Sequence, residues 1–331
     1  MANLYFTSLS PGAGKTALAA ACVASLAAQG KKARYYKPLS AKTADQDAAF
    51  CRQVFGEAAG PTPVTATQES LREGLDVHAP AVQKAAQTLG ADATLCIEGL
   101  DASGESAKVS ADLARLLGAQ VVGVVRYRRG MDLAPVHGLK QVFGQQFKGV
   151  VLNAVPATSL RVASEESKPA LEAGGVPVLG IIPEDRLLLS FTVAEYSARL
   201  GGRILNNEER ADQIVESILV GANALDQGEF YYATAENKAL ITRGDRPDLQ
   251  FSALNTSTRC LILTHGVSPI PYVLDHAVEQ EVPVVVVPKG TLATIEAIEG
   301  FIAQSSFHHR DKLARAVQLW DAHVDKRALG I

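Results

Sequence analysis

Basic residues, paired cysteines and long apolar segments are scarce in this sequence, and each shortage excludes a class of protein. The net charge of −3 argues against a nucleic-acid partner, because phosphate backbones select basic surfaces. The four cysteines are scattered and none forms a CxxC pair, so neither a zinc site nor a disulfide framework is indicated. The longest apolar runs, such as residues 17–28, are rich in alanine and too short to span a bilayer.

These shortages leave a globular protein of the cell interior. The chain has 331 residues, of which 47% are hydrophobic and 20% charged, a size and composition typical of a folded protein with two domains. The first expected strand begins almost at Met1, so we expect no secretory leader. We therefore predict a cytoplasmic protein with reduced thiols and without a membrane anchor.

The first part of the chain alternates short apolar runs with helical stretches. Most of the runs are continuously apolar, which indicates burial on both faces, as in a parallel sheet covered by helices. The expected strands are residues 4–9, 34–37, 94–98, 121–126, 149–153 and 177–182. The expected helices include residues 15–29, 79–89, 106–117 and 164–173. This pattern predicts a doubly wound, mostly parallel α/β domain over residues 1–205.

The character of the sequence changes after Leu205. Residues 206–210 are polar and predict a linker. Buried strands are then expected over residues 238–242, 260–264 and 282–287, and helices over 249–254, 270–280, 292–303 and 310–325. We therefore predict a second, smaller α/β domain over residues 206–331.

A glycine-rich segment, residues 8–16 (SLSPGAGKT), lies between the first expected strand and the first expected helix. This is the position of a P-loop, whose backbone N–H groups point at phosphates while a lysine reaches the β- and γ-oxygens and a hydroxyl binds Mg²⁺. The residues expected to hold a purine nucleoside triphosphate, ATP with Mg²⁺, are Pro11, Gly12, Ala13, Gly14, Lys15 and Thr16. Leu9 stands where the usual motif has its first glycine, and the alternative is a glycine-rich turn with an incidental lysine.

Polar residues at other strand ends complete the expected site, because ligands bind at the carboxyl edge of a parallel sheet. Lys37 closes the second strand and is either a phosphate-binding lysine or a solvated one. Asp45 and Asp47 follow in a polar loop, where each is either a helix cap or a Mg²⁺ ligand, and Asp47 is our candidate ligand. Glu98 ends the third strand and suits a Mg²⁺ ligand better than a surface glutamate.

Asn153 ends the next strand but one. Its side-chain amide offers both a donor and an acceptor, which suits the reading of an adenine edge. The alternative is an asparagine in an ordinary turn.

Together these segments resemble dethiobiotin synthetase, and more closely the amino-terminal region of long bacterial phosphate acetyltransferases. The resemblance in the first domain is carried by residues 8–16, 37–40, 45–50, 98–99, 151–156 and 179–185. In those acetyltransferases a DRTGG domain follows, and residues 240–246, 261–266 and 284–291 resemble its signatures, with His265 in place of a glycine. The resemblance implies a P-loop fold, and it implies a homo-oligomer because relatives of the first domain often dimerise.

Two departures from the family limit the expected reaction. Leu100, Asp101 and Ala102 follow Glu98-Gly99 where dethiobiotin synthetases have Ala-Gly-Gly, and Leu39-Ser40-Ala41 replace another small-residue segment. Both changes lie where the diamine substrate would bind. The acyl-transfer domain of the family is also missing after Ile331, so we do not expect acetyl transfer to phosphate from this chain alone.

Two kinds of function fit the sequence. The first is an ATPase or ATP-dependent ligase acting on a small carboxylate or carbamate, in which Lys15 and Lys37 stabilise charge on the transferred phosphoryl group. The second is a regulatory module whose DRTGG domain binds a small carboxylate or phosphate through Asp245 and Arg246, with an intradomain salt bridge as the alternative role of this pair. A third possibility, which sequence does not separate from the second, is a stand-alone subunit for a separate acyltransferase chain.

Overall fold

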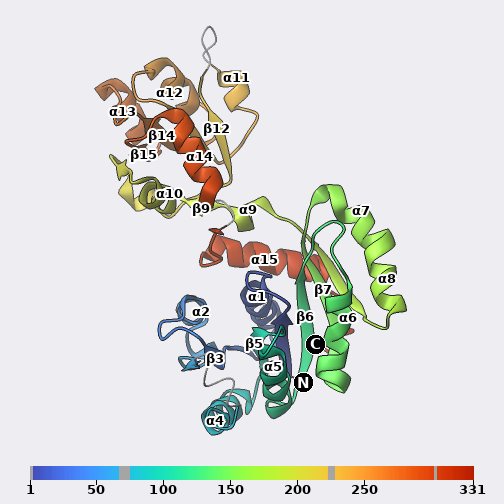
Figure 1. The fold of residues 1–331 in the computed structure, drawn as a ribbon. Helices are drawn as coiled ribbons and strands as arrows, with labels where there is room; N and C mark the ends of the chain where they lie inside the picture. Colours follow the sequence, from blue (N-terminus) through green and yellow to red (C-terminus); the bar gives the residue numbers. More distant parts are fainter. Residues whose placement is uncertain (1–2, 67–74, 223–227, 302–303) are drawn as a thin grey trace. The chain divides into compact units, whose positions relative to one another are not determined.

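The computed structural model describes residues 3–66, 75–222, 228–301 and 304–331 of the chain (Figure 1). Contacts between Cα atoms divide the chain into two compact units. The first unit comprises Met1–Asp185 together with Phe307–Ile331, and the second comprises Arg186–Ser306.

The first unit is built on a six-stranded sheet with the order β2-β5-β1-β6-β7-β8. All neighbouring strands in it run parallel. Its strands are β1 (Asn3–Ser8), β2 (Ala33–Tyr36), β5 (Thr94–Asp101), β6 (Ala119–Arg126), β7 (Phe147–Val155) and β8 (Val178–Pro183). A small parallel pair, β3 (Leu39–Ser40) and β4 (Val64–Thr65), lies outside this sheet. The predicted doubly wound α/β fold is confirmed.

Helices occupy the connections between these strands, as the apolar pattern predicts. They are α1 (Lys15–Ala28), α2 (Gln46–Phe55), α4 (Ala79–Gly90), α5 (Ser106–Leu116), α6 (Ala134–Phe143), α7 (Leu160–Val162) and α8 (Lys168–Ala173). Helix α15 (Arg310–His323) also belongs to this unit and follows the second unit in the chain. A π-helical turn, Ala163–Ser167, interrupts the helix that the sequence predicts over residues 164–173. The connecting helices cover both faces of the sheet, and the carboxyl ends of its strands stay available for a site.

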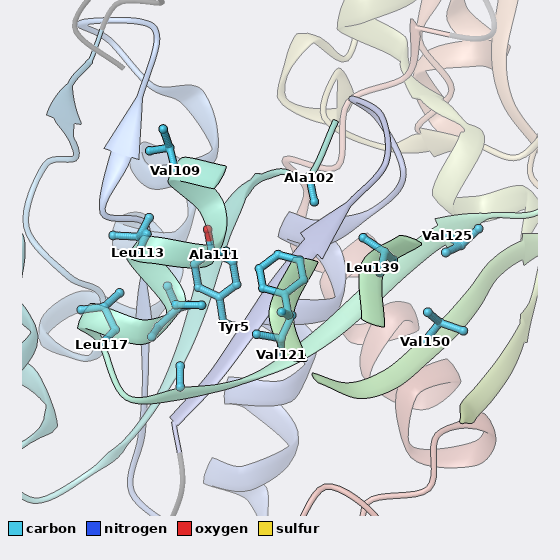
Figure 2. Close-up of a cluster of buried hydrophobic side chains, with 14 of the residues drawn as sticks. Tyr5, Ala102, Val109, Ala111, Leu113, Leu117, Val121, Val125, Leu139 and Val150 are labelled. Carbon is cyan, nitrogen blue, oxygen red and sulfur yellow. The ribbon is translucent and has the colours of Figure 1, made fainter. Parts of the chain in front are cut away.

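The two faces of the sheet can be distinguished on β1, because successive side chains of a strand point to opposite sides. Tyr5 is fully buried in a cluster with residues of α4, α5 and α6. Figure 2 shows it among side chains of α5 and β6, including Leu113 and Val121. Phe6 instead packs edge-on against Trp320 of α15, with ring centroids 5.9 Å apart. Helices α4, α5 and α6 therefore cover one face, and α15 packs on the other.

Gly99 on β5 lies against the ring of Tyr5, and we expect Gly99→Ala to destabilise the first unit by about 3 kcal/mol. A Cβ at Gly99 would come within 2.1 Å of the Tyr5 ring. Moving the ring would break the hydrogen bond in which Leu100 N donates to Tyr5 Oη (3.0 Å). Gly138→Ala is the matched control because its Cβ would enter open space on α6, and we expect it to be neutral or slightly stabilising.

The measurement is chemical denaturation followed by tryptophan fluorescence. Trp320 is the only tryptophan of the chain and is fully buried in the first unit, so its signal reports on that unit. An unchanged midpoint for Gly99→Ala would contradict the packing of Tyr5 described above.

The last residues of the chain depart from the predicted domain division. The sequence predicts a single domain over residues 206–331, but the compact first unit includes Phe307–Ile331. Helix α15 packs along α1, and Val324 forms an isolated bridge with Gly180 on the edge strand β8. Burial of Trp320 against Phe6 explains why this helix belongs to the first sheet.

The second unit has a five-stranded sheet with the order β10-β15-β14-β13-β12. Its strands are β10 (Arg203–Ile204), β12 (Ser217–Val220), β13 (Lys238–Arg243), β14 (Thr258–Thr264) and β15 (Val284–Val286), and only β10 pairs antiparallel among them. Its longer helices are α10 (Val193–Leu200), α12 (Pro247–Leu254), α13 (Pro271–Glu279) and α14 (Thr291–Phe301). The shorter elements are α9 (Arg186–Leu189), β9 (Phe191–Thr192), β11 (Ile214–Val215) and α11 (Glu229–Tyr232).

Side chains of β13 alternate between two apolar layers in this unit. Ala239 and Ile241 pack in a cluster with residues of α10 and α14, whereas Leu240 packs with residues of α12 and α13. Helices therefore cover both faces of this sheet as well, and the predicted α/β character is confirmed. The predicted helix over residues 292–303 begins as expected, and its last two residues lie outside the described part of the chain.

The predicted linker, residues 206–210, is folded into the second unit. The side chain of Asn206 donates to Val282 O (3.0 Å) and accepts from Val284 N (2.9 Å). Glu208–Arg210 forms a short 3-10 helix. The polar side chain of Asn206 therefore makes hydrogen bonds within the second unit, and residues 206–210 do not form a linker.

Candidate nucleotide-binding site

The predicted P-loop connects β1 to α1 at the carboxyl edge of the first sheet. Gly12 and Gly14 have positive φ angles of 73° and 104°, a region that glycine adopts without strain. Gly14 caps α1, whose first turn carries Lys15 and Thr16 and no acidic residue. The loop therefore has the backbone form and the helix N-terminus that an anionic ligand needs.

Asn153 of β7 holds this loop from the side. Its amide nitrogen donates to Ala13 O (2.8 Å), and a Cβ at position 14 would come within 2.3 Å of the same nitrogen. Gly14 is therefore required both by its φ angle and by the approach of Asn153. The reading of adenine by Asn153 stays a prediction, and the structure shows in addition that its amide nitrogen is committed to the loop.

Lys15 is held by two residues at the ends of β1 and β5. Its ammonium group forms an ion pair with Asp101 and donates to Ser8 Oγ (2.9 Å). Ser8 in turn donates to Asp101 Oδ1 (2.5 Å). Asp101 was not among the predicted site residues, because the predicted strand ended at Glu98 whereas β5 runs on to Asp101.

Lys37 lies among three carboxylates. Its ammonium group is 2.7 Å from Asp47 Oδ2, 2.9 Å from Glu98 Oε1 and 3.0 Å from Asp45 Oδ2. Burial lowers the pKa of this lysine, but the charges of Glu98 and Asp47 outweigh that effect and hold its pKa above the ordinary value. Lys37 is therefore a charged, largely buried lysine and not a solvated strand-end residue.

The three carboxylates differ in their surroundings. Glu98 is buried, which raises its pKa above the ordinary value although Lys37 opposes the shift, and its Oε2 accepts a short hydrogen bond from the Tyr35 hydroxyl. Burial would also raise the pKa of Asp47, but His308 and Lys37 hold it well below the usual range. Asp45 caps α2 by accepting from Ala48 N (2.9 Å), so it fulfils the capping alternative as well as contacting Lys37.

His308 and Tyr35 belong to this cluster and were missed by the sequence reasoning. The Nε2 atom of His308 lies 2.8 Å from Asp47 Oδ1, and its ring packs against Phe50 of α2. His308 comes from the returning segment of the chain, more than 250 residues after Asp47, and no local motif announces it. Tyr35 is visible only as an aromatic residue two positions before Lys37.

Family models match nearly the whole chain. Residues 2–190 match the AAA domain model and residues 195–301 match the DRTGG domain model. The first match covers more than half of the sequence. The chain belongs to this AAA-domain family. The expected resemblance is thereby confirmed for both parts, and the AAA domain contains every site residue described above except His308.

Two curated relatives align with the chain over part of their own length. A phosphate acetyltransferase of Nitratidesulfovibrio vulgaris is 24% identical over 370 aligned residues, which cover 99% of this chain and 51% of that protein. A phosphate acetyltransferase of Deinococcus radiodurans is 25% identical over 324 residues, covering 89% of this chain and 46% of that protein. The chain spans about half the length of the curated relatives it matches.

Solved structures overlap with the chain only loosely. Cobyrinic acid a,c-diamide synthase from Mycobacterium smegmatis, with bound ADP and magnesium, gives a TM-score of 0.37 at 16% identity and covers 56% of this chain and 88% of that chain. The CBS and DRTGG domains of a Clostridium perfringens pyrophosphatase, complexed with diadenosine tetraphosphate, give 0.28 at 17% identity over 40% of this chain and 67% of that chain. The family assignment therefore rests on the domain models.

The donor set of the AAA domain fits a Mg²⁺ ion that arrives with a nucleotide. Among the described residues, no group of three or more His, Cys, Asp or Glu side chains is arranged to hold a metal by itself. The predicted oxygen donors are the Thr16 hydroxyl, in the first turn of α1, and the Asp47 and Glu98 carboxylates, which the structure places around Lys37. The carboxylate that contacts Lys15 of the P-loop is that of Asp101. Mg²⁺ is usually bound by only one or two protein carboxylates, and phosphates and water complete its octahedral coordination. The predicted donor set agrees with this.

The predicted effector residues of the DRTGG domain are engaged in ion pairs. Asp245 accepts from both Arg243 Nε (2.9 Å) and Nη2 (2.6 Å), and Arg246 makes the same forked pair with Asp248. These residues are at the carboxyl end of β13 and the start of α12. The salt-bridge alternative is therefore observed for each residue, although with a partner other than the one considered, and effector binding stays a prediction.

No helix in the described ranges of the chain has the length and apolarity needed to cross a membrane.

Proposed function

We propose that the chain binds Mg-ATP at the P-loop of its AAA domain and transfers the terminal phosphoryl group either to water or to a small carboxylate. The observation that supports this most is the position of Lys15, at the start of α1 and behind a loop with positive-φ glycines. Thr16, Asp47 and Glu98 would hold the Mg²⁺, which when bound supplies positive charge at the phosphates. Lys37 is the second cation of the site and would stabilise charge on the transferred group.

The chemistry is an in-line displacement at the γ-phosphorus. In hydrolysis an oxygen of water forms the new bond while the bond to the ADP oxygen breaks, and the water proton leaves to solvent. In ligation a carboxylate oxygen forms the bond and yields an acyl phosphate and ADP. The protein contributes positioning and charge, which is how phosphoryl transfer is generally catalysed.

This proposal predicts that the full chain releases ADP from Mg-ATP and that a small acid accelerates the release. We expect turnover on the order of 1–10 s⁻¹ in the presence of the right acid, as for ordinary enzymes. ADP release is measured with acetate, propionate and succinate in turn, and hydroxylamine is added to trap an acyl phosphate as its hydroxamate. ATP binding without ADP release under all of these conditions would contradict phosphoryl transfer.

A second candidate function is a regulatory module or subunit for a separate phosphate acetyltransferase. The relatives that favour it are phosphate acetyltransferases, and the chain matches about half of their length. In this function the AAA domain binds ATP without turnover and the DRTGG domain binds a small anion beside Arg246. The test is whether adding this chain, with or without ATP, changes the acetyl-transfer rate of the remaining half of a matched relative.

A further inference from the structure

Asp101 stands beside Lys15, the lysine proposed to bind phosphate, at the point where β5 ends next to β1. It is paired in register with Ser8, the last residue of β1, and lies three residues beyond Glu98. This register brings its side chain to the start of the P-loop. Its carboxylate contacts both Lys15 and Ser8.

The ion pair between Lys15 and Asp101 is largely shielded from water. The side chains of Lys15 and Asp101 are 12% and 23% exposed. In such a position the attraction between the two charges is stronger than on an open surface. The Ser8 hydroxyl bonded to both residues keeps the arrangement in register.

We propose that Asp101 determines nucleotide affinity and its dependence on Mg²⁺, a proposal that rests on nucleotide binding at this P-loop. A phosphate that binds Lys15 has either to replace Asp101 or to lie beside it. The first event breaks an ion pair, and the second brings two negative charges together in a partly desolvated site. Asp101 therefore opposes phosphate binding in both cases.

The opposition is smaller for the metal complex of the nucleotide. Partial neutralisation of the phosphates by Mg²⁺ reduces their repulsion with the carboxylate. Binding of Mg²⁺ and of ATP is thereby coupled, and this coupling is reciprocal because it is a free energy. Asp101 strengthens the preference of the site for Mg-ATP over the free nucleotide, and Asp101→Asn weakens that preference.

A structural role for the side chain makes the opposite prediction. The backbone contacts of this segment, in which Ala102 N donates to Ser8 O and Ser106 Oγ donates to Asp101 O, do not involve the carboxylate. An asparagine keeps the size of the side chain and its ability to accept from Ser8. If Asp101 only held the loop in shape, its loss would weaken nucleotide binding and would not strengthen it.

The experiment is calorimetric titration of the full-length wild type and Asp101→Asn with ATP, once in EDTA and once in excess Mg²⁺. We expect the variant to bind free ATP about tenfold more tightly than the wild type, a typical size for coupling between two ligands. The gain with Mg-ATP should be smaller, so the ratio of the two affinities falls. Asp101→Ala, read in the same way, replaces the asparagine variant if the latter does not fold.

Asp92→Asn is the matched control. Asp92 pairs with Lys32 and Arg34 just before the opposite end of β5, so the variant makes the same change of charge about 30 Å away along the strand. We expect both of its affinities to equal those of the wild type. An equal gain in this control would show a general charge effect and would overturn the proposal.

The outcomes separate this inference from the proposed function. The role of Asp101 is overturned, and nucleotide binding is left intact, if the wild type binds ATP but neither variant binds free ATP more tightly. The two variants are Asp101→Asn and Asp101→Ala. If neither the wild type nor the variants bind ATP in either buffer, both the role of Asp101 and nucleotide binding at the P-loop are overturned. Binding of free ATP by the variant alone supports the role of Asp101 directly.

Discussion

Lys15→Ala is expected to weaken the binding of Mg-ATP by about a hundredfold and to remove any ATP turnover. The ammonium group is the only cationic side chain in the first turn of α1. Loss of a charge-assisted hydrogen bond to phosphate costs about 2–3 kcal/mol, which corresponds to that factor. Titration calorimetry with Mg-ATP measures the affinity, and ADP release measures the turnover.

Lys32→Ala is the control for this change. Lys32 precedes β2, its side chain is 72% exposed, and it pairs with Asp92 at the other edge of the sheet. The control removes the same charge, so its affinity for Mg-ATP should match that of the wild type. Equal binding by Lys15→Ala and the wild type would place the nucleotide elsewhere and would remove the basis of the site.

Lys37→Met is expected to destabilise the first unit by about 3 kcal/mol at neutral pH, because it leaves a buried carboxylate without its cation. Glu98 is 5% exposed and, among the described residues, would keep only the Tyr35 hydroxyl as a partner, while Asp45 and Asp47 would repel it. For a unit of this size the loss lowers the melting temperature by roughly 6–12 °C. Denaturation followed by Trp320 fluorescence measures it.

The destabilisation should depend on pH with a definite sign. The pKa of Glu98 is already raised in the folded protein, and loss of Lys37 raises it further. A carboxyl with a raised folded pKa is destabilising only when it is ionised, so the variant should approach the wild type as the pH falls toward the ordinary pKa of a glutamate. Above that pH the difference in the free energy of unfolding between the wild type and Lys37→Met should grow as Glu98 becomes ionised.

Two companion variants test this explanation. Adding Glu98→Gln to Lys37→Met should recover part of the lost stability, because it removes the unpaired charge itself. Lys84→Met changes an exposed lysine of α4 and should alter the free energy of unfolding by no more than about 0.5 kcal/mol. A pH-independent loss for Lys37→Met would mean that packing, and not the buried charge, is responsible.

The parts of the site that could be predicted from the sequence are those in which local order determines position. A lysine and a threonine that follow a strand and a glycine-rich turn lie at the start of the next helix. The carboxyl ends of parallel strands meet at one edge of the sheet. Lys37 and Glu98 are for this reason brought together as expected. The same reasoning placed Asn153 near the loop, although its amide nitrogen turned out to support the backbone.

The residues that were missed depend on tertiary structure. Asp101 required the strand to continue past Glu98, which a polar residue and a glycine in the sequence argued against. His308 required the chain to return to the first sheet after a whole second unit, and only the packing of α15 beside α1 reveals that return. Sequence patterns of this kind report on neighbours along the chain, and these contacts join segments that are far apart in it.

The division of the chain into two units determines which fragments a proteolytic cut produces. Because the second unit is an insertion between β8 and α15, a single proteolytic nick within residues 186–306 leaves both fragments carrying a piece of the first unit. The two fragments remain associated through the interface of α1 and α15, much as the halves of a split reporter protein do. Denaturant would then separate the nicked chain into two polypeptides, whereas the intact chain unfolds as one.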